Sequence, residues 1–152
     1  MLKYTVPIKP ISINATYKRG AGRGFYLSDE ARVFKDTLQF YGRLAATRAK
    51  HKTTENIVGV RIDFYFQSAR SDIDGPIKSV LDSLQHSQIV KNDSQVKEFS
   101  VGSHIDKLAP RVEIYLAEIK DSGFLGLRWM LHLLTQYLRS PALGYTQPKH
   151  QS

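Results

Sequence analysis

Two aspartates one residue apart, Asp72 and Asp74, lie in the stretch SDIDGPIKSVLDSL, directly ahead of a helical pattern. Residues two apart in an extended chain point to the same side, so these carboxylates can converge on one ion. Hard carboxylate oxygens suit Mg²⁺ or Mn²⁺, which bind through a few carboxylates together with substrate phosphate. Asp93 can join them only if the turn after the helix folds back. On the functional interpretation, Lys78 in the first helical turn points at a phosphate or a metal-bound water, because stabilising the charge that develops on phosphorus needs such a cation.

The same residues have a purely structural interpretation. Asp-x-Asp is common in solvated loops, and Asp74 ahead of Gly75 and Pro76 suits a helix N-cap. Lys78 can form an ordinary ion pair with Asp74 or Asp82, each four residues away. The spacing alone leaves both interpretations open.

The composition favours a polyanionic partner. The 152 residues carry a formal net charge of +8, which suits nucleic acid first and an acidic membrane surface second. A solubilising excess of surface cations is the structural alternative. The chain has no cysteine, which excludes disulfides and thiolate zinc sites and fits a reducing compartment. The N-terminus has the pattern of a strand, with no visible signal peptide.

The hydrophobic pattern predicts a single α+β domain, a mixed β-sheet flanked by helices, over residues 1–119. Ser28 is the expected N-cap of the first long helix, with acidic residues in its first turn. Residues 12–24 are rich in glycine and arginine and predict a mobile basic loop. The expected strands cover 2–8, the short apolar run 25–27, 58–66, 96–105 and 111–119, and the expected helices cover 29–50 and 76–86.

Residues 71–96 resemble the core pattern of the RusA family of Holliday-junction resolvases, the crossover junction endodeoxyribonucleases of bacteria and their phages. That pattern is Asp-x-Asp, a lysine four residues after the second aspartate, Asp-[Ala/Ser]-Leu in the helix, and a later Asp-x-Gln. The matching residues, with no gaps in spacing, are Asp72, Asp74, Lys78, Asp82-Ser83-Leu84 and Asp93-Ser94-Gln95. Upstream, Pro10, Ser12 and Asn14 resemble the family's P-x-S-x-N signature, and LSDEARVFKD resembles the start of its first long helix.

The resemblance implies a mixed α/β domain that works as a homodimer with two active sites. Asp72, Asp74 and Asp93 would be the metal ligands and Lys78 the catalytic cation, with Mg²⁺ as cofactor and Mn²⁺ as a substitute. The implied substrate is branched DNA, a four-way junction resolved by paired symmetric nicks. Because such a junction has a pseudo-two-fold axis, an isologous dimer can address two strands of like polarity. The implied setting is cytoplasmic and nucleoid-associated, in a bacterium or phage.

Two positions depart from the family pattern. Gly75 stands where asparagine is usual, which removes a polar side chain near the metal. Asn92 stands where an acidic residue is usual, so this position keeps its hydrogen-bonding capacity and brings no charge. The four central residues are all present, which favours activity with altered metal affinity or substrate preference.

Cations around these motifs are candidate DNA contacts, and each is equally interpretable as a solvated surface charge except Arg70, whose position beside the acidic residues slightly favours a phosphate contact. The candidates are Lys18, Arg19 and Arg23 in the glycine-rich loop, with Arg70 and Lys91 flanking the acidic residues. Tyr17 or Phe25 could wedge a junction centre open, and packing at a strand edge is the structural alternative.

Residues 120–152 form an extension outside the family pattern, with a predicted amphipathic helix over 122–139. It is too short and too charged to span a membrane, and we expect it to pack on its own domain or on a dimer partner. Peripheral membrane contact is the alternative.

Two other functions compete with junction resolution. One keeps the chemistry and prefers forks or flaps. The other is a junction-binding protein without cleavage, whose acidic residues only cap a helix.

Overall fold

The computed structural model describes residues 1–11, 17–19, 24–69 and 71–119. The predictions for residues 120–152, Arg23 and Arg70 lie outside these ranges. The described elements, in chain order, are β1 (Leu2–Val6), β2 (Tyr17–Arg19), β3 (Phe25–Leu27), α2 (Asp29–Arg48), β4 (Val58–Phe66), α3 (Asp74–His86), the 3-10 helix η1 (Asp93–Gln95), β5 (Val96–Ile105) and β6 (Arg111–Glu118).

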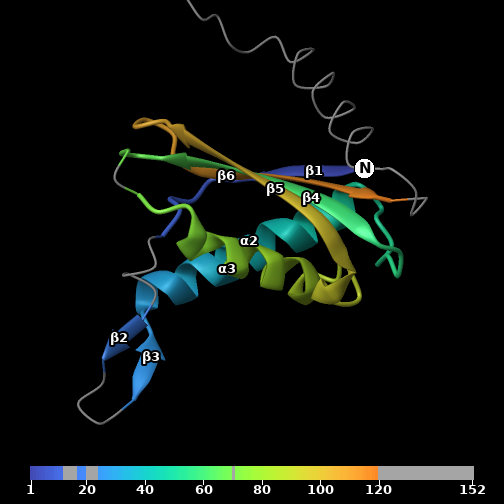
Figure 1. The fold of residues 1–152 in the computed structure, drawn as a ribbon. Coiled ribbons are helices and arrows are strands. Elements are labelled where there is room, and N and C mark those ends of the chain that lie inside the picture. Colours follow the sequence, from blue (N-terminus) through green and yellow to red (C-terminus); the bar gives the residue numbers. More distant parts are fainter. Residues whose placement is uncertain (12–16, 20–23, 70, 120–152) are drawn as a thin grey trace, which may run out of the picture. The chain divides into compact units, whose positions relative to one another are not determined.

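Four strands form a mixed sheet in the order β1-β6-β4-β5 (Figure 1). β6 pairs antiparallel with both β1 and β4. β5 pairs parallel with β4, and α3 provides the crossover connection that a parallel pair requires. The predicted α+β class with a mixed sheet is therefore confirmed.

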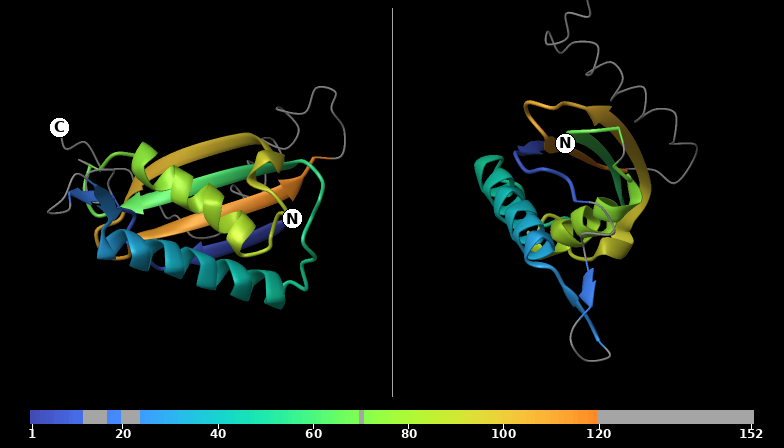
Figure 2. Two further views of the ribbon diagram at one scale, coloured as in Figure 1. Left: turned by 90° about the horizontal axis from the view of Figure 1, so that it is seen from below. Right: turned by 90° about the vertical axis from the view of Figure 1, so that its left-hand side faces the viewer.

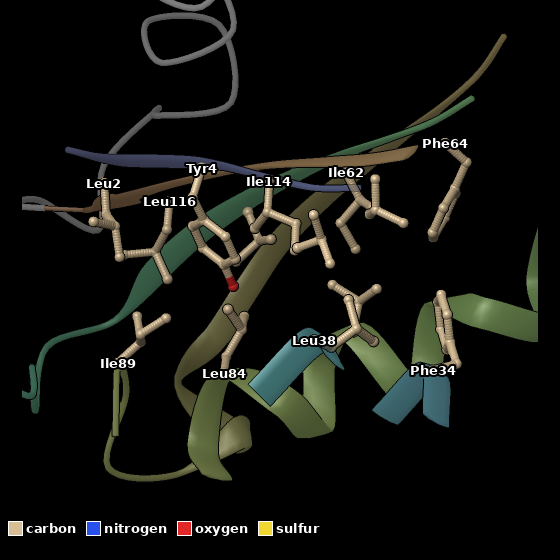
Figure 3. Packing of buried hydrophobic residues seen from close by; sticks show 14 of the residues in the cluster. Leu2, Tyr4, Phe34, Leu38, Ile62, Phe64, Leu84, Ile89, Ile114 and Leu116 are labelled. Carbon is tan, nitrogen blue, oxygen red and sulfur yellow. The ribbon is translucent and has the colours of Figure 1, made fainter. Parts of the chain in front are cut away.

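Both long helices cover the same face of the sheet (Figure 2). Their apolar residues meet the inward-facing side chains of the strands, which alternate along β1 and β6. Phe34 and Leu38 of α2 and Leu84 of α3 are fully buried in this core, opposite Ile62 and Ile114 (Figure 3). This packing fixes the orientation of both helices, and so of the residues at their ends.

α2 and α3 start at the same end of the domain. Ser28 caps α2, since its hydroxyl accepts a hydrogen bond from the Ala31 N–H at 3.1 Å, as predicted. Farther along, Ser87 Oγ donates to Gln39 O at 3.1 Å, and a Cβ at Gly42 would lie 2.5 Å from Ser87 Oγ. The two helices therefore approach closely near the C-terminal end of α3, and both run back from there to the same end (Figures 1 and 2).

Residues 17–19 form a strand, which corrects the prediction of a loop over 12–24. β2 and β3 pair antiparallel as a separate two-stranded sheet, with Tyr17 opposite Leu27 and Lys18 opposite Tyr26. A hairpin this short is marginal by itself, so it depends on its attachment to α2. Leu27 packs against the core and Ser28 begins the helix directly after it.

A polar network lies on the sheet face opposite the helices. Arg61 donates to both carboxylate oxygens of the fully buried Asp63, each at 2.9 Å, and His104 Nε2 lies 3.1 Å from Asp63 Oδ1. Tyr65 stacks on the His104 ring at 4.7 Å, and the Arg111 guanidinium lies 3.5 Å from the centre of the Tyr65 ring. Burial opposes ionisation of Asp63, but the hydrogen bonds from Arg61 and His104 outweigh it and lower its pKa.

Candidate metal and DNA site

Asp72 and Asp74 lie at the start of α3, with exposed side chains. Neither carboxylate makes a hydrogen bond or ion pair with the described residues. Ile73, between them, is half-buried and packs against the core, which fixes the backbone at this point. Both carboxylates are therefore accessible to a ligand from solvent.

The backbone here differs from two expectations. Helix α3 begins at Asp74 and not at Pro76, and Ile73 has φ −80° and ψ −28°, a helical conformation. The extended geometry that would point Asp72 and Asp74 to the same side is therefore absent at Ile73. Asp74 is also not the N-cap, because Ile73 occupies that position and provides no side-chain hydrogen bond. As the first helical residue, Asp74 instead places a negative charge at the positive end of the helix dipole.

Lys78 is exposed on the next turn of α3. Its Nζ lies 3.4 Å from Asp82 Oδ1, so Asp82, and not Asp74, is the ion-pair partner. An exposed i,i+4 pair contributes about 0.5 kcal/mol or less. Lys78 can therefore leave Asp82 for a phosphate at little cost.

Asp93 begins η1, the single helical turn that follows α3. Asn92 and Gln95 form a capping box around it: Ser94 N–H donates to Asn92 Oδ1 at 2.8 Å, and Asn92 N–H donates to Gln95 Oε1 at 2.7 Å. Asn92, the second departure from the family pattern, thus has a structural role as this cap.

The turn that carries Asp93 is also attached to the neighbouring loop. The Gln95 side-chain amide donates to Thr54 O at 3.0 Å and to Asn56 O at 2.7 Å. The Asp93 N–H donates to Gln85 Oε1 at 3.4 Å, which places Asp93 beside the last turn of α3. These contacts hold Asp93 at this end of the helix.

Asp72 and Asp74 are sequence neighbours at the start of α3, and the structure places Asp93 beyond the other end of this helix. Asp74 and Gln85 are the first residue and the last-but-one residue of α3, so about 17 Å of helix separates them. Within the described residues, no three acidic or histidine side chains form a cluster that could hold a metal ion. The turn that carries Asp93 therefore does not fold back toward Asp72 and Asp74 of the same chain.

The predicted DNA contacts are described to different extents. Lys18 is exposed on β2, and Arg19 is described in its backbone only. Lys91 Nζ forms an exposed ion pair with Glu55 Oε1 at 2.8 Å, which lowers the pKa of Glu55. Lys91 precedes η1, so it lies near Asp93 and not near Asp72.

The aromatic residues of the hairpin are exposed, which contradicts the interpretation that they pack at a strand edge. Phe25 is 76% exposed and Tyr17 is 55% exposed. Sequence reasoning also missed Asp63, because its partner His104 is 41 residues away in the sequence. The available signal was the presence of two opposite charges, Arg61 and Asp63, two residues apart in a largely apolar strand.

A basic chain, a mixed α+β sheet, and two exposed carboxylates with no partner among the described residues are the features that a metal-dependent nuclease requires. Residues 7–117 match the family model of the endodeoxyribonuclease RusA. The chain therefore belongs to the RusA family of Holliday-junction resolvases, nucleases that in general depend on a divalent metal. A search of curated proteins found no match. Within the described part of the chain, no helix has the length and apolar character that crossing a membrane requires.

Proposed function

We propose that this protein resolves four-way DNA junctions as a Mg²⁺-dependent homodimer that makes paired symmetric nicks. The observation that carries the proposal is the pair of exposed carboxylates, Asp72 and Asp74, which have no partner among the described residues and stand beside the weakly held Lys78 in a RusA-family chain. The wider basic surface attracts the DNA backbone, and the local acidic pair provides a place for a cation.

The donor chemistry fits a hard divalent ion. Exposed carboxylates and solvent are the ligands that Mg²⁺ prefers, and Mn²⁺ accepts the same set. When bound, such an ion neutralises phosphate charge and activates water. Lys78 adds a second positive charge for the scissile phosphate once it leaves Asp82.

The position of Asp93 supports the homodimer. If two copies of α3 lie antiparallel across a two-fold axis, the Asp93 end of one copy meets the Asp72–Asp74 end of the other. Each of two equivalent sites then contains all three carboxylates. The edge strand β5 exposes two large apolar side chains, Phe99 and Ile105, on the same sheet face as the helices, and a second copy would cover them.

Cleavage of a labelled four-way junction with a mobile core tests the proposal. Wild type, Asp72→Asn and Asp36→Asn would be compared in Mg²⁺ and in EDTA. Asp36→Asn is the matched control, because it makes the same chemical change at an exposed position on α2. We expect paired symmetric nicks that require both metal and Asp72 and that survive Asp36→Asn.

Two results would contradict the proposal. Tight binding without nicks in Mg²⁺ and in Mn²⁺ would leave a junction-binding protein. Preferential cleavage of forks or flaps in competition with the four-way junction would keep the chemistry and change the substrate.

A further inference from the structure

The β2–β3 hairpin exposes three aromatic side chains in two three-residue strands. Phe25 is 76% exposed, Tyr17 is 55% exposed and Tyr26 is 47% exposed. Lys18, on the paired strand, is exposed as well. Large apolar side chains so far out of the core contribute little to folding, so their presence together requires another explanation.

The hairpin has an anchored base and an exposed outer part. Cross-strand partners share a face, so Tyr17 and Leu27 lie on one face and Lys18 and Tyr26 on the other. Leu27 is half-buried against the core, while Phe25, two residues farther from the helix on the same face, is the most exposed of the three aromatics. The hairpin therefore holds the Phe25 ring away from the body of the domain on a fixed base.

The hairpin also extends from the end of the domain that carries the acidic pair. β3 leads through Ser28 directly into α2, and α2 and α3 begin at the same end (Figures 1 and 2). Asp72 and Asp74 lie at the start of α3 at that end. The hairpin and the acidic pair are therefore at the same end of the domain, where one branched DNA can contact both.

We propose that the β2–β3 hairpin recognises the branch point of the DNA, with Phe25 stacking on an unstacked base there and Lys18 contacting a phosphate. The proposal rests on the proposed function in that it takes branched DNA as the partner. A branch point differs from duplex DNA in offering unstacked bases, and an aromatic ring accepts any base because every base has a π-face. Lys18 adds a positive charge for the adjacent backbone. The hairpin thus supplies selectivity for junctions, while the acidic pair supplies the site of cleavage.

The test is a binding titration in EDTA, which prevents cleavage. The probes are a four-way junction with 2-aminopurine at the branch point and a duplex with the same base fully paired. We expect Phe25→Ala to weaken junction binding roughly 5- to 150-fold, the loss of one base–aromatic stack, and to leave duplex binding unchanged. The fluorescence change that wild type produces at the branch point should be lost as well.

Three variants separate stacking from other effects. Phe25→Trp should retain junction binding, and Phe25→Leu, apolar without a ring, should behave as Phe25→Ala does. Phe40→Ala is the matched control, because Phe40 is a 63% exposed aromatic on α2 and should leave both affinities unchanged. Circular dichroism melting would confirm that every variant is folded.

Equal losses of junction and duplex binding would indicate groove insertion and overturn the proposal. Unchanged junction binding, or equal behaviour of Phe25→Leu and Phe25→Trp, would also overturn it. If wild type cleaves the junction in Mg²⁺ and Phe25→Ala binds the junction as tightly as wild type does, the proposed role of the hairpin is refuted and the proposed endonuclease activity stands. If junction binding depends on Phe25 but no metal supports cleavage, the proposed role of the hairpin is supported and the proposed endonuclease activity is refuted.

Discussion

If two chains share each active site, two inactive variants should restore activity when they are combined in one dimer. The pair is Asp72→Asn and Asp93→Asn. If the sites are shared, one active site of the heterodimer contains both substitutions. The other site contains the native Asp72–Asp74 pair of one chain and the native Asp93 of the other chain. If each chain forms its own site, both sites of the heterodimer carry a substitution and no activity returns.

The geometry sets the expected size of the effect. Ligands of one Mg²⁺ ion bind at about 2.1 Å from it, whereas about 17 Å of α3 separates the two acidic positions within a chain. Side-chain rotation cannot close this gap, so Asp93 cannot complete the site of its own chain. Activity should therefore return in the heterodimer only if the site is shared between chains. A purified heterodimer has one intact site of two, so we expect about half the wild-type nicking rate, with single nicks in place of paired ones.

Co-expression with two different affinity tags gives the heterodimer free of either homodimer. The assay follows nicking of each strand of a labelled four-way junction in Mg²⁺. Asp72→Asn combined with Lys78→Ala is the matched control, because both substitutions lie at the same end of α3 and leave no intact site. No recovery with Asp93→Asn, or an Asp93→Asn homodimer that cleaves normally, would refute the shared site.

Further predictions concern the polar network on the sheet face opposite the helices. Asp63→Ala should lower the free energy of unfolding, measured by urea titration, by about 2–4 kcal/mol. This is less than the largest losses found when one partner of a buried ion pair is removed, because Arg61 and His104 are partly exposed. Asp36→Ala should change it by less than about 0.5 kcal/mol, and similar values for both variants would contradict this assignment. Because the folded state lowers the pKa of Asp63, its contribution is complete above the unfolded pKa near 3.9 and is lost as the pH falls through the folded pKa. Urea midpoints should therefore fall more steeply on acidification for wild type than for Asp63→Asn, and parallel curves would show that Asp63 does not titrate in this way.

Periodic patterns in the sequence were sufficient for most of the fold. The alternation in residues 58–66 predicts β4 with the observed bounds, and Ser28 marks the start of α2. The start of α3 was placed two residues late because proline is tolerated throughout the first helical turn, where its missing N–H has no helical partner. Pro76 is the third residue of the helix, so it does not mark its first position.

Contacts between distant segments explain what the sequence did not reveal. β2 has three residues and exists only through its pairing with β3, which no local periodicity reports. Asp63 lies in a strand whose neighbours are apolar, and its partner His104 comes from β5. Gly102, which pairs with Asp63 on the neighbouring strand β5, is a further case. A Cβ at Gly102 would clash with Asp63 Oδ1. Only the assembled sheet shows that this strand position must lack a side chain.

The acidic motif illustrates a different limit. Its spacing predicts which residues take part, but a straight helix between two ligands separates them by its own length. Nothing in α3 shortens that distance, since Gly75 and Pro76 lie in its first turn and the helix continues unbroken to His86. Beyond the C-terminal end of α3, the hydrogen bonds of Gln95 hold η1 against the loop of Thr54 and Asn56, which keeps Asp93 away from Asp72 and Asp74 of the same chain. For a site that uses all three carboxylates, the missing one must come from a second copy, and the interface between the copies must then run along α3.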